Sequence, residues 1–428
     1  MVPIYINPPS EEWESLTRRA AFDDGDIAAA VETILSRVRR EGDKAVREIT
    51  AEVEGRTVDC LEVSGDEIAE AAAAVPQELK SAMETAARNI RLFHEAQRTD
   101  GVDVTVQAGV RCVQRAVPIQ RAGLYVPGGT APLFSTVLML AIPAQVAGCP
   151  EIVLCTPAGK DGRVTPAVLY AAQLCGVGHV FKAGGAQAIG AMAYGTESIP
   201  KVDKIFGPGN RYVTKAKQTV SVADTAIDMP AGPSEVLVMA DRATAVPEFV
   251  AADMLSQAEH GADSQAILVC NCEQFAAQVA RALEKQAAGL SRREATVRAL
   301  ANSRIVVLPT RGEMIGLANL YAAEHLLIQM PDPWDVAARI TAAGSVFIGN
   351  WSPESAGDYA SGTNHTLPTA GWARAYSGVN LDSFMRKITY QELTREGLGS
   401  LAGTITAMAE AEGLDAHSNA VKVRLENR

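Results

Sequence analysis

The chain has few residues of the kinds that mark several common classes of protein. Its seven cysteines are scattered, and none of them forms a CxxC pair. Cys270 and Cys272 lie closest together, in a strand-like run where alternation would point them to opposite faces. A cysteine zinc site or a disulfide framework is therefore not expected, and the pattern fits a protein of the reducing cytoplasm.

Long apolar runs and basic blocks are also missing. The longest apolar run, STVLMLAIPA, is too short to span a bilayer and contains a proline. The net charge is −11, so nucleic acid and anionic membranes are poor partners. The opening residues, MVPIYINPPSEEWE, lack the basic and apolar regions of a secretory signal, and we expect none.

What the chain does contain is typical of a globular protein of two or three domains. It has 428 residues, of which 47% are hydrophobic and 21% charged. The spacing of apolar residues predicts helices over 27–50 and 65–97, with Gly55 in the break between them. From about residue 119, apolar strand-like runs alternate with alanine-rich helical stretches: strands at 152–155, 179–184 and 204–207, and helices at 132–147, 165–175, 186–194 and 210–221. Such alternation predicts a parallel sheet with right-handed crossovers.

A second series of the same kind follows. It consists of strands at 234–240, 266–270, 304–309 and 344–349, with helices at 247–260 and 273–300. The last fifty residues look helical, around 381–397 and 401–412. We therefore expect an α/β protein with two incomplete, doubly wound, Rossmann-like domains and small helical segments at each terminus, and the two series suggest related halves.

Glycine-bearing turns are the first candidates for a ligand site. No complete GxGxxG motif follows a strand, because GPGNRY and GVGHVF both fail at the last position. Three other turns are present, at 123–129, 184–190 and 207–210. The last two follow strands and open helices, where the backbone can approach an anion closely. One such loop is more often a simple tight turn, but two at successive strand ends favour a phosphate-bearing cofactor.

The six histidines can be weighed singly. His94 lies in a charged helical stretch and is expected to be solvated or to cap a helix end. His179 begins a strand and is expected to be structural, and His365 lies in a polar loop that favours a hydrogen-bonding role. Gln257 and His260 share one helix face, and the negative end of that helix favours a cation.

Acidic groups accompany the remaining histidines. Glu324 and His325 are adjacent, and the two side chains could exchange protons if burial raises the pKa of the carboxyl. Asp358 offers an anionic oxygen, and His417 follows Glu412 near the C-terminus. A set of Gln, His, Asp and His would suit zinc or manganese with an open position. Spacing alone leaves open whether the four converge, and each also has a purely structural interpretation.

At this point the residues resemble one family, histidinol dehydrogenase. The resemblance rests on GLYVPGGTAPLFSTVLMLAIPA, FKAGGAQAIGAMAYGTESIPKVDKIFGPGN, DMPAGPSEV, LSQAEHG, EHL, SGTNHTLPT and EGLDAH. These blocks occur in order from about residue 25 to the end. One departure is Ala323, where the family often has proline before the Glu–His pair; this removes no functional group.

The resemblance implies an NAD- and zinc-dependent enzyme that oxidises L-histidinol to L-histidine through L-histidinaldehyde. It implies zinc ligands at Gln257, His260, Asp358 and His417. The acid–base pair would be Glu324 and His325. Substrate contacts would come from Ser234, Gln257, His260, His325, Asp358, Glu412 and His417, and cofactor contacts from Tyr125, Gln187 and Asn210.

The family is also a homodimer with shared active sites. By this resemblance, residues 1–24 would form an N-terminal arm, and 25–122 plus 234–378 a discontinuous first α/β domain. Residues 123–233 would form the NAD-binding domain. Residues 379–428 would form a helical segment that carries Glu412 and His417 into the partner's site.

Two other functions remain open. One is a zinc-dependent alcohol dehydrogenase acting on another small polar alcohol, such as a sulfonated diol. Glu412 and His417 argue against it, because a cationic, imidazole-bearing substrate gives them something to contact. The other is a non-catalytic metal- or nucleotide-binding protein, which would require the acid–base pair to be missing.

Overall fold

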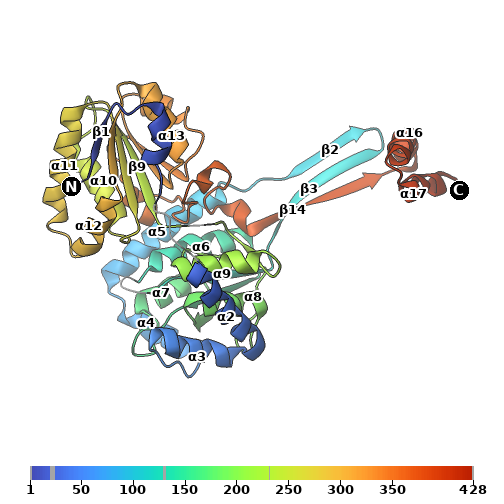
Figure 1. Ribbon diagram of the computed structural model, residues 1–428. Coiled ribbons are helices and arrows are strands. Elements are labelled where there is room, and N and C mark those ends of the chain that lie inside the picture. Colours follow the sequence, from blue (N-terminus) through green and yellow to red (C-terminus); the bar gives the residue numbers. More distant parts are fainter. Residues whose placement is uncertain (1, 20–24, 129–131, 231, 427–428) are drawn as a thin grey trace.

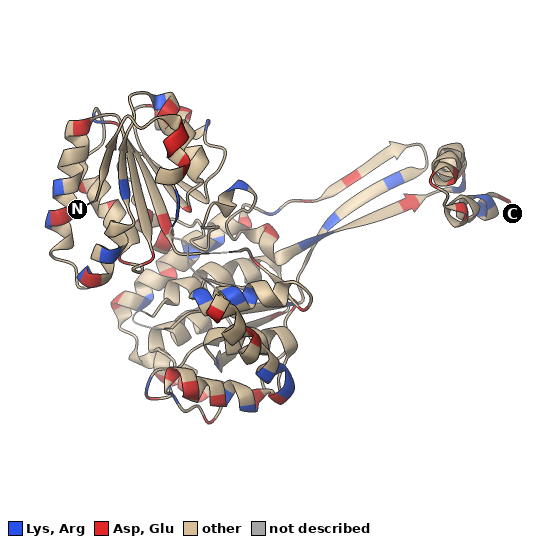
Figure 2. Cartoon of the chain, viewed as in Figure 1, with Lys and Arg blue, Asp and Glu red and all other residues tan. Residues whose placement is uncertain are grey.

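The chain folds into two α/β domains and a three-stranded ribbon that projects away from them (Figure 1). The computed structural model describes residues 2–19, 25–128, 132–230 and 232–426. None of the helices in these ranges is long and apolar enough to cross a membrane. Acidic and basic side chains are interspersed along the outer helices (Figure 2), so the net negative charge is not gathered on one element.

One domain is built on a six-stranded parallel sheet with the order β1-β11-β10-β9-β12-β13. Its strands are β1 (Ile4–Ile6), β9 (Glu235–Ala240), β10 (Gln265–Cys270), β11 (Arg304–Val307), β12 (His325–Gln329) and β13 (Ser345–Ile348). Its helices are η1 (Ser10–Glu12), α1 (Trp13–Leu16), α10 (Pro247–Ala258), α11 (Glu273–Ala287), α12 (Arg293–Ala301), α13 (Arg311–Tyr321), α14 (Pro333–Ala337) and α15 (Glu354–Tyr359). Strands β9 and β10 are buried along their whole length. After their first residues, Glu235 and Gln265, both strands are apolar throughout, as expected for strands covered by helices on both faces.

The other domain is built on a five-stranded parallel sheet with the order β6-β5-β4-β7-β8. Its strands are β4 (Arg121–Tyr125), β5 (Glu151–Thr156), β6 (His179–Lys182), β7 (Lys204–Phe206) and β8 (Ala226–Ile227). They alternate with α6 (Phe134–Ala147), α7 (Pro166–Leu174), α8 (Gly185–Tyr194) and α9 (Arg211–Ser221). In both sheets the first strand of the series lies inside, two strands follow on one side and two on the other. This shared winding confirms the predicted α/β class with parallel sheets.

The helices before this sheet pack on it, which differs from the predicted grouping of 25–122 with 234–378. They are α2 (Gly25–Glu41), α3 (Asp43–Glu54), α4 (Gly65–Ala74) and α5 (Gln77–Glu95). Helices α2 and α3 contact α8, α4 contacts α7, and α5 contacts α6. The apolar stripe of α2, including Val31 and Leu35, enters the same core as Ile189 of α8. The predicted single helices over 27–50 and 65–97 are each broken in two, at Gly42 (φ 55°) and before Pro76.

The ribbon is antiparallel, with the order β14-β3-β2. It consists of β2 (Val102–Gln107), β3 (Val110–Pro118) and β14 (Met385–Leu393), and two short turns, η2 (Trp372–Arg374) and η3 (Leu381–Phe384), precede the last strand. Helices α16 (Arg395–Ala411) and α17 (Asp415–Glu426) lie at its far end (Figure 1). The helix predicted over 381–397 is wrong. Residues 385–393 form a strand because they pair with β3 along their full length, a contact distant in sequence.

Candidate active site

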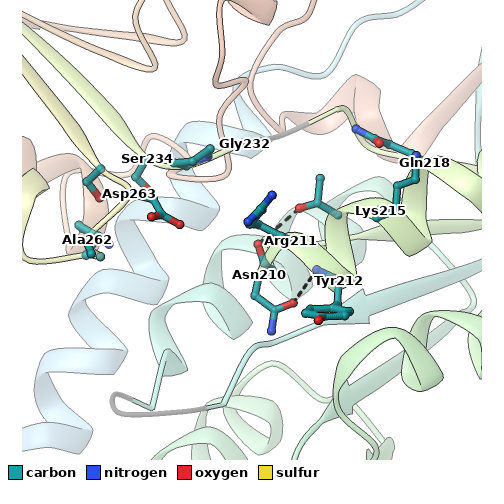
Figure 3. Close-up of a pocket in the computed structure, with 15 residues that line it drawn as sticks. Asn210, Arg211, Tyr212, Lys215, Gln218, Gly232, Ser234, Ala262 and Asp263 are labelled. Carbon is teal, nitrogen blue, oxygen red and sulfur yellow. Dashed lines mark hydrogen bonds between the residues drawn. The ribbon is translucent and has the colours of Figure 1, made fainter. Parts of the chain in front are cut away.

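A pocket of about 630 Å³ opens between the two domains (Figure 3). One wall is formed by the first turns of α9, including Asn210 and Lys215. The other wall is formed by the segment before β9, with Ser234, and the segment after α10, with His260. The volume suits a small polar molecule. Two residues predicted to contact substrate, Ser234 and His260, and one predicted to contact cofactor, Asn210, therefore line the same cavity.

Gln257 lies in the last turn of α10, which ends at Ala258, two residues before the predicted end at residue 260. Gln257 is 0% exposed, and neither its amide oxygen nor its amide nitrogen has a hydrogen-bond partner among the described residues. His260 follows the last turn and its side chain is 44% exposed. A buried amide without partners costs about 1–3 kcal/mol, so this arrangement is one that a ligand would complete.

Asp358, on α15, joins these residues. Its Oδ2 lies 4.0 Å from Nε2 of His260, and its Oδ1 lies 3.6 Å from Nε2 of His325. His260, Glu354 and Asp358 each place one ligand atom within 4.8 Å of the other two. Three of the four predicted metal ligands thus come from neighbouring segments: Gln257 from α10, His260 from the residues just after it, and Asp358 from α15.

The Glu324–His325 pair lies at the start of β12, a strand that sequence reasoning missed. Both side chains are buried, and Nδ1 of His325 is 3.7 Å from Oε2 of Glu324. The backbone N–H of Glu235, on the adjacent strand β9, donates to Oε2 of Glu324 at 2.9 Å. The carbonyl of Glu235 lies 3.4 Å from Nδ1 of His325. One residue of β9 therefore contacts both members of the pair.

Burial and neighbouring charges shift the pKa values of the acidic groups and of His325. Burial raises the pKa of Glu324 to about 7 and that of Glu354 to about 8. Burial alone lowers the pKa of His325, but Glu324, Glu354 and Asp358 outweigh it and raise this pKa to about 10. Burial likewise acts to raise the pKa of Asp358, yet the neighbouring histidines, His325 above all, hold it below its usual value. Proton-exchanging groups are thus gathered beside the candidate ligands.

The glycine turns of the five-stranded domain lie at the carboxyl ends of its strands, as predicted, although residues 129–131 of the first turn are outside the described ranges. Tyr125 ends β4, and its hydroxyl accepts a hydrogen bond from the N–H of Gly185 at 3.1 Å. Gln187 lies in the first turn of α8 and donates to Glu54 at 3.1 Å. The Asn210 side chain caps α9 through the N–H groups of residues 212 and 213. The three predicted cofactor residues therefore lie at the carboxyl ends of three strands of one sheet, β4, β6 and β7.

Comparison with known proteins identifies the family. A family model described as histidinol dehydrogenase matches residues 17–425. The histidinol dehydrogenase of Bacteroides thetaiotaomicron is 56% identical over 425 residues, 99% of each chain. That of Escherichia coli (strain K12) is 52% identical over 419 residues, 97% of this chain and 95% of the other. The crystal structure of histidinol dehydrogenase from Elizabethkingia anophelis is 52% identical, with a TM-score of 0.97 over 99% of this chain and 98% of that one.

The chain belongs to the histidinol dehydrogenase family. The resemblance noted in the sequence is thereby confirmed. The protein is accordingly an oxidoreductase, and its membership of this family supports a role in the final steps of histidine biosynthesis.

Two predicted residues of the histidinol dehydrogenase site lie elsewhere in this chain. Glu412 follows α16 and His417 is on α17, and both are exposed. The ribbon holds these helices away from both domains (Figure 1). A single chain therefore does not bring them to Gln257, His260 and Asp358, and their supply by a partner stays a prediction.

The fold also corrects and adds to the residues singled out from sequence. His94 is fully buried, with Nδ1 2.7 Å from the carbonyl of Ile90, so the expected solvated or capping role is wrong. His365 has the expected hydrogen-bonding role, with Nδ1 3.0 Å from the carbonyl of Asp358. Glu354 was missed; its only signal was the four-residue spacing to Asp358 on one helix. Glu235 was missed because its role depends on the neighbouring strand.

Proposed function

We propose that this protein oxidises L-histidinol to L-histidine through L-histidinaldehyde, with NAD as hydride acceptor and zinc as bound metal. The observation that carries the proposal is the buried, unpartnered amide of Gln257 beside His260 and Asp358, next to the Glu324–His325 pair. Family membership supports the substrate, because the relatives are named for it.

The chemistry of the donor set fits zinc. Gln257, His260 and Asp358 offer an amide oxygen, an imidazole nitrogen and a carboxylate, a mixture that suits a borderline metal ion. A cation here would also satisfy the orphaned Gln257 oxygen. Zinc, when bound, would orient the amino and imidazole nitrogens of L-histidinol.

His325 acts as the base in this proposal. A carbonyl can only accept, so a hydrogen bond to Glu235 requires the proton on Nδ1 and leaves Nε2 with a lone pair. Nε2 has no hydrogen-bond partner among the described residues. A cation held by Asp358 would oppose the rise in the His325 pKa, because it neutralises one of the three carboxylates that cause it. The imidazole then takes the alcohol proton in the first oxidation.

Glu324 acts between the two oxidations. Its carboxylate, with a pKa of about 7, accepts a proton from the water that adds to the aldehyde. His325 accepts a proton again as the hydrated aldehyde becomes the acid. Both side chains are shielded from bulk water, which limits loss of the aldehyde between the steps.

The cofactor would lie along the strand ends that carry Tyr125, Gln187 and Asn210. NAD, when bound there, accepts the hydride in each oxidation. Gly207 supports this location, because a Cβ at that residue would lie 2.0 Å from the carbonyl of Tyr125. The close approach holds the turn after β7 against the end of β4, at the point where the sheet winding reverses.

The site would be completed in a homodimer. Glu412 and His417 from the partner subunit would contact substrate, and the latter would also ligate zinc. The projecting ribbon supports this arrangement, since it carries both residues away from their own chain's cavity (Figure 1).

The decisive experiment follows NADH absorbance after the purified protein is mixed with NAD and L-histidinol, before and after treatment with a chelator. We expect NADH to form, the chelator to abolish it and added zinc to restore it. A panel of other small alcohols, including a sulfonated diol, serves as the comparison. Turnover of another alcohol but not of L-histidinol would reject the proposed substrate.

A further inference from the structure

Arg19, in the N-terminal segment, forms an ion pair next to the acid–base pair. Its Nε lies 2.5 Å from Oε2 of Glu235, and its Nη2 lies 2.7 Å from Oε1. The same Nη2 donates to the carbonyl of Tyr321 at 2.7 Å, and the guanidinium lies over the Tyr321 ring at 4.2 Å. The Glu235 side chain is only 2% exposed, so water screens this bidentate pair little.

Glu235 connects this ion pair to both members of the acid–base pair. Its N–H donates to the Glu324 carboxylate, and its carbonyl faces Nδ1 of His325. The first contact fixes the direction of the carboxylate, and the second selects the tautomer whose Nε2 can accept a proton. A shift of residue 235 would therefore disturb both groups together.

Tyr321 connects Arg19 to the pair from the other side. It is the last residue of α13, and Glu324 follows three residues later. Between them, Ala322 has a φ of 53°, a left-handed conformation that is strained for alanine. A cation bonded to the Tyr321 carbonyl stabilises the helix end from which this strained turn departs.

We propose that Arg19 is a positioning residue for the acid–base pair. By binding the Glu235 carboxylate and the Tyr321 carbonyl at once, it holds the two backbone segments that orient Glu324 and His325. The inference rests on the proposed function, since it assumes that this pair performs the proton transfers. It gives the N-terminal segment a part in catalysis without contact to substrate.

The first test replaces Arg19 with Met and measures steady-state oxidation of L-histidinol. We expect kcat to fall about 10- to 100-fold, because small misplacements of reacting groups have effects of this size. The KM for L-histidinol and the zinc content should change less than about two-fold, since within the described parts of the chain Arg19 bonds to Glu235 and Tyr321, which are neither candidate ligands nor pocket-lining residues. Arg18→Met is the matched control, because the neighbouring Arg18 side chain is exposed and its removal deletes the same charge.

The second test asks whether the loss passes through the pair. In a His325→Asn background the base is already missing, so Arg19→Met should cost less than about three-fold further. A general structural role would instead lower activity by the same factor in both backgrounds. Equal factors would overturn the proposal, as would an Arg19→Met enzyme as fast as Arg18→Met.

A second variant covers the case in which Arg19→Met does not fold. Glu235→Gln keeps the N–H and carbonyl of residue 235 but loses the ionic partner of Arg19, so kcat should again fall with KM little changed. Arg19→Lys should recover part of the loss, because one ammonium retains the charge but not the planar fork. Wild-type kcat in Glu235→Gln would overturn the proposal. If the wild-type chain makes no NADH from L-histidinol, the proposed function is rejected, and the role of Arg19, which depends on it, is rejected as well.

Discussion

Three buried carboxyl groups, Asp253, Glu324 and Glu354, and the half-buried Asp358 lie within or beside the site, and their surroundings separate their roles. Asp358 is held below its usual pKa by neighbouring histidines, whereas burial raises the pKa of the other three. A group that stays ionised suits a metal ligand, and one that titrates near neutrality suits proton transfer. The same residue type therefore serves different chemistry through its environment.

The role of His325 predicts a loss of turnover without a loss of metal. Replacing it with Asn should lower the rate of both oxidations by a factor of about 10² to 10⁴, the usual cost of removing one base. Single-turnover kinetics from L-histidinol and from L-histidinaldehyde measure the two steps, and metal analysis supplies the control. Loss of zinc from this variant would contradict the assignment of His325 as a base rather than a ligand.

The role proposed for Glu324 predicts that its replacement slows the two oxidations unequally. Replacing it with Gln should slow oxidation of L-histidinaldehyde more than the first, pre-steady-state hydride transfer from L-histidinol, because water is activated only between the oxidations. Stopped-flow measurement of NADH formation separates the two phases. Equal slowing of both would argue against this division of roles.

Asp253 predicts a pH dependence of stability. It is 6% exposed, and burial raises its pKa to about 7, although hydrogen bonds from Glu354 and Gln329 partly oppose the shift. The unfolded carboxyl titrates near about 3.9. Between these values the folded state holds a proton that the unfolded state has released, so this group's contribution to stability falls as pH rises through the window.

The test compares wild type with Asp253→Asn in urea unfolding. From about pH 5 to about pH 8, wild type should lose about 1–3 kcal/mol more of its unfolding free energy than the variant. The exposed Glu78→Gln, which also removes one carboxylate, is the control and should follow wild type. A parallel pH dependence for Asp253→Asn and wild type would reject the interpretation.

At the scale of elements, the site lies between the amino-terminal edge of the six-stranded sheet and the carboxyl-terminal edge of the five-stranded sheet. Ser234, Glu235 and His325 lie at the amino ends of β9 and β12, and α10 returns its C-terminus to the same edge. The glycine turns lie instead at the carboxyl ends of β4 and β7. The pocket between them is thus lined by Ser234 and His260 of one domain and by Asn210, at the candidate cofactor edge of the other.

The turn after β7 can be tested by a pair of glycine variants. Gly207 and Gly148 both have positive φ, 123° and 85°. A Cβ at Gly148 would meet nothing within 4 Å, whereas one at Gly207 would lie 2.0 Å from the Tyr125 carbonyl. Gly148→Ala should therefore cost about 1 kcal/mol for backbone strain, and Gly207→Ala at least about 2–3 kcal/mol, with a raised KM for NAD. Equal losses in urea unfolding, with KM unchanged, would show that the close approach is unimportant.

At the scale of the whole molecule, the ribbon is too extended to serve its own chain's pocket. Strand β14 pairs with β3 over nine residues and ends before α16 and α17, which lie far from the two domains (Figure 1). If the assembly is an isologous dimer, each chain's helices can enter the partner's site.

Subunit mixing tests this arrangement. His417→Ala and His325→Asn should each be nearly inactive alone, yet regain activity after exchange of subunits. In each heterodimer one site would combine both intact residues and the other would carry both defects. Random exchange at equal amounts makes about half of all dimers mixed, so recovery should approach about a quarter of wild-type activity. No recovery after demonstrated exchange would reject the shared site.

Features that depend on neighbours along the chain could be predicted from sequence. Most strands and helices of both α/β series follow from apolar runs and alanine-rich stretches, although β12 and α13 were missed. Strand β5 and helix α9 lie within one residue of their predicted bounds. Gln257 was correctly placed near the end of a helix, whereas His260 lies beyond it, and their joint role as ligands stays a prediction. Membership of the family could also be predicted from the sequence, because the family's motifs occur in order.

Features that depend on contacts between distant segments required the folded chain. Residues 385–393 became a strand because β3 supplies their hydrogen bonds, and His94 became buried because α5 packs on α6. The contacts of Glu235 with the acid–base pair exist only because β9 lies beside β12. The ion pair of Arg19 with Glu235 likewise requires the N-terminal segment to pack against β9. Local periodicity records which face of an element is apolar; which faces meet is decided by packing, and the site exists only where they meet.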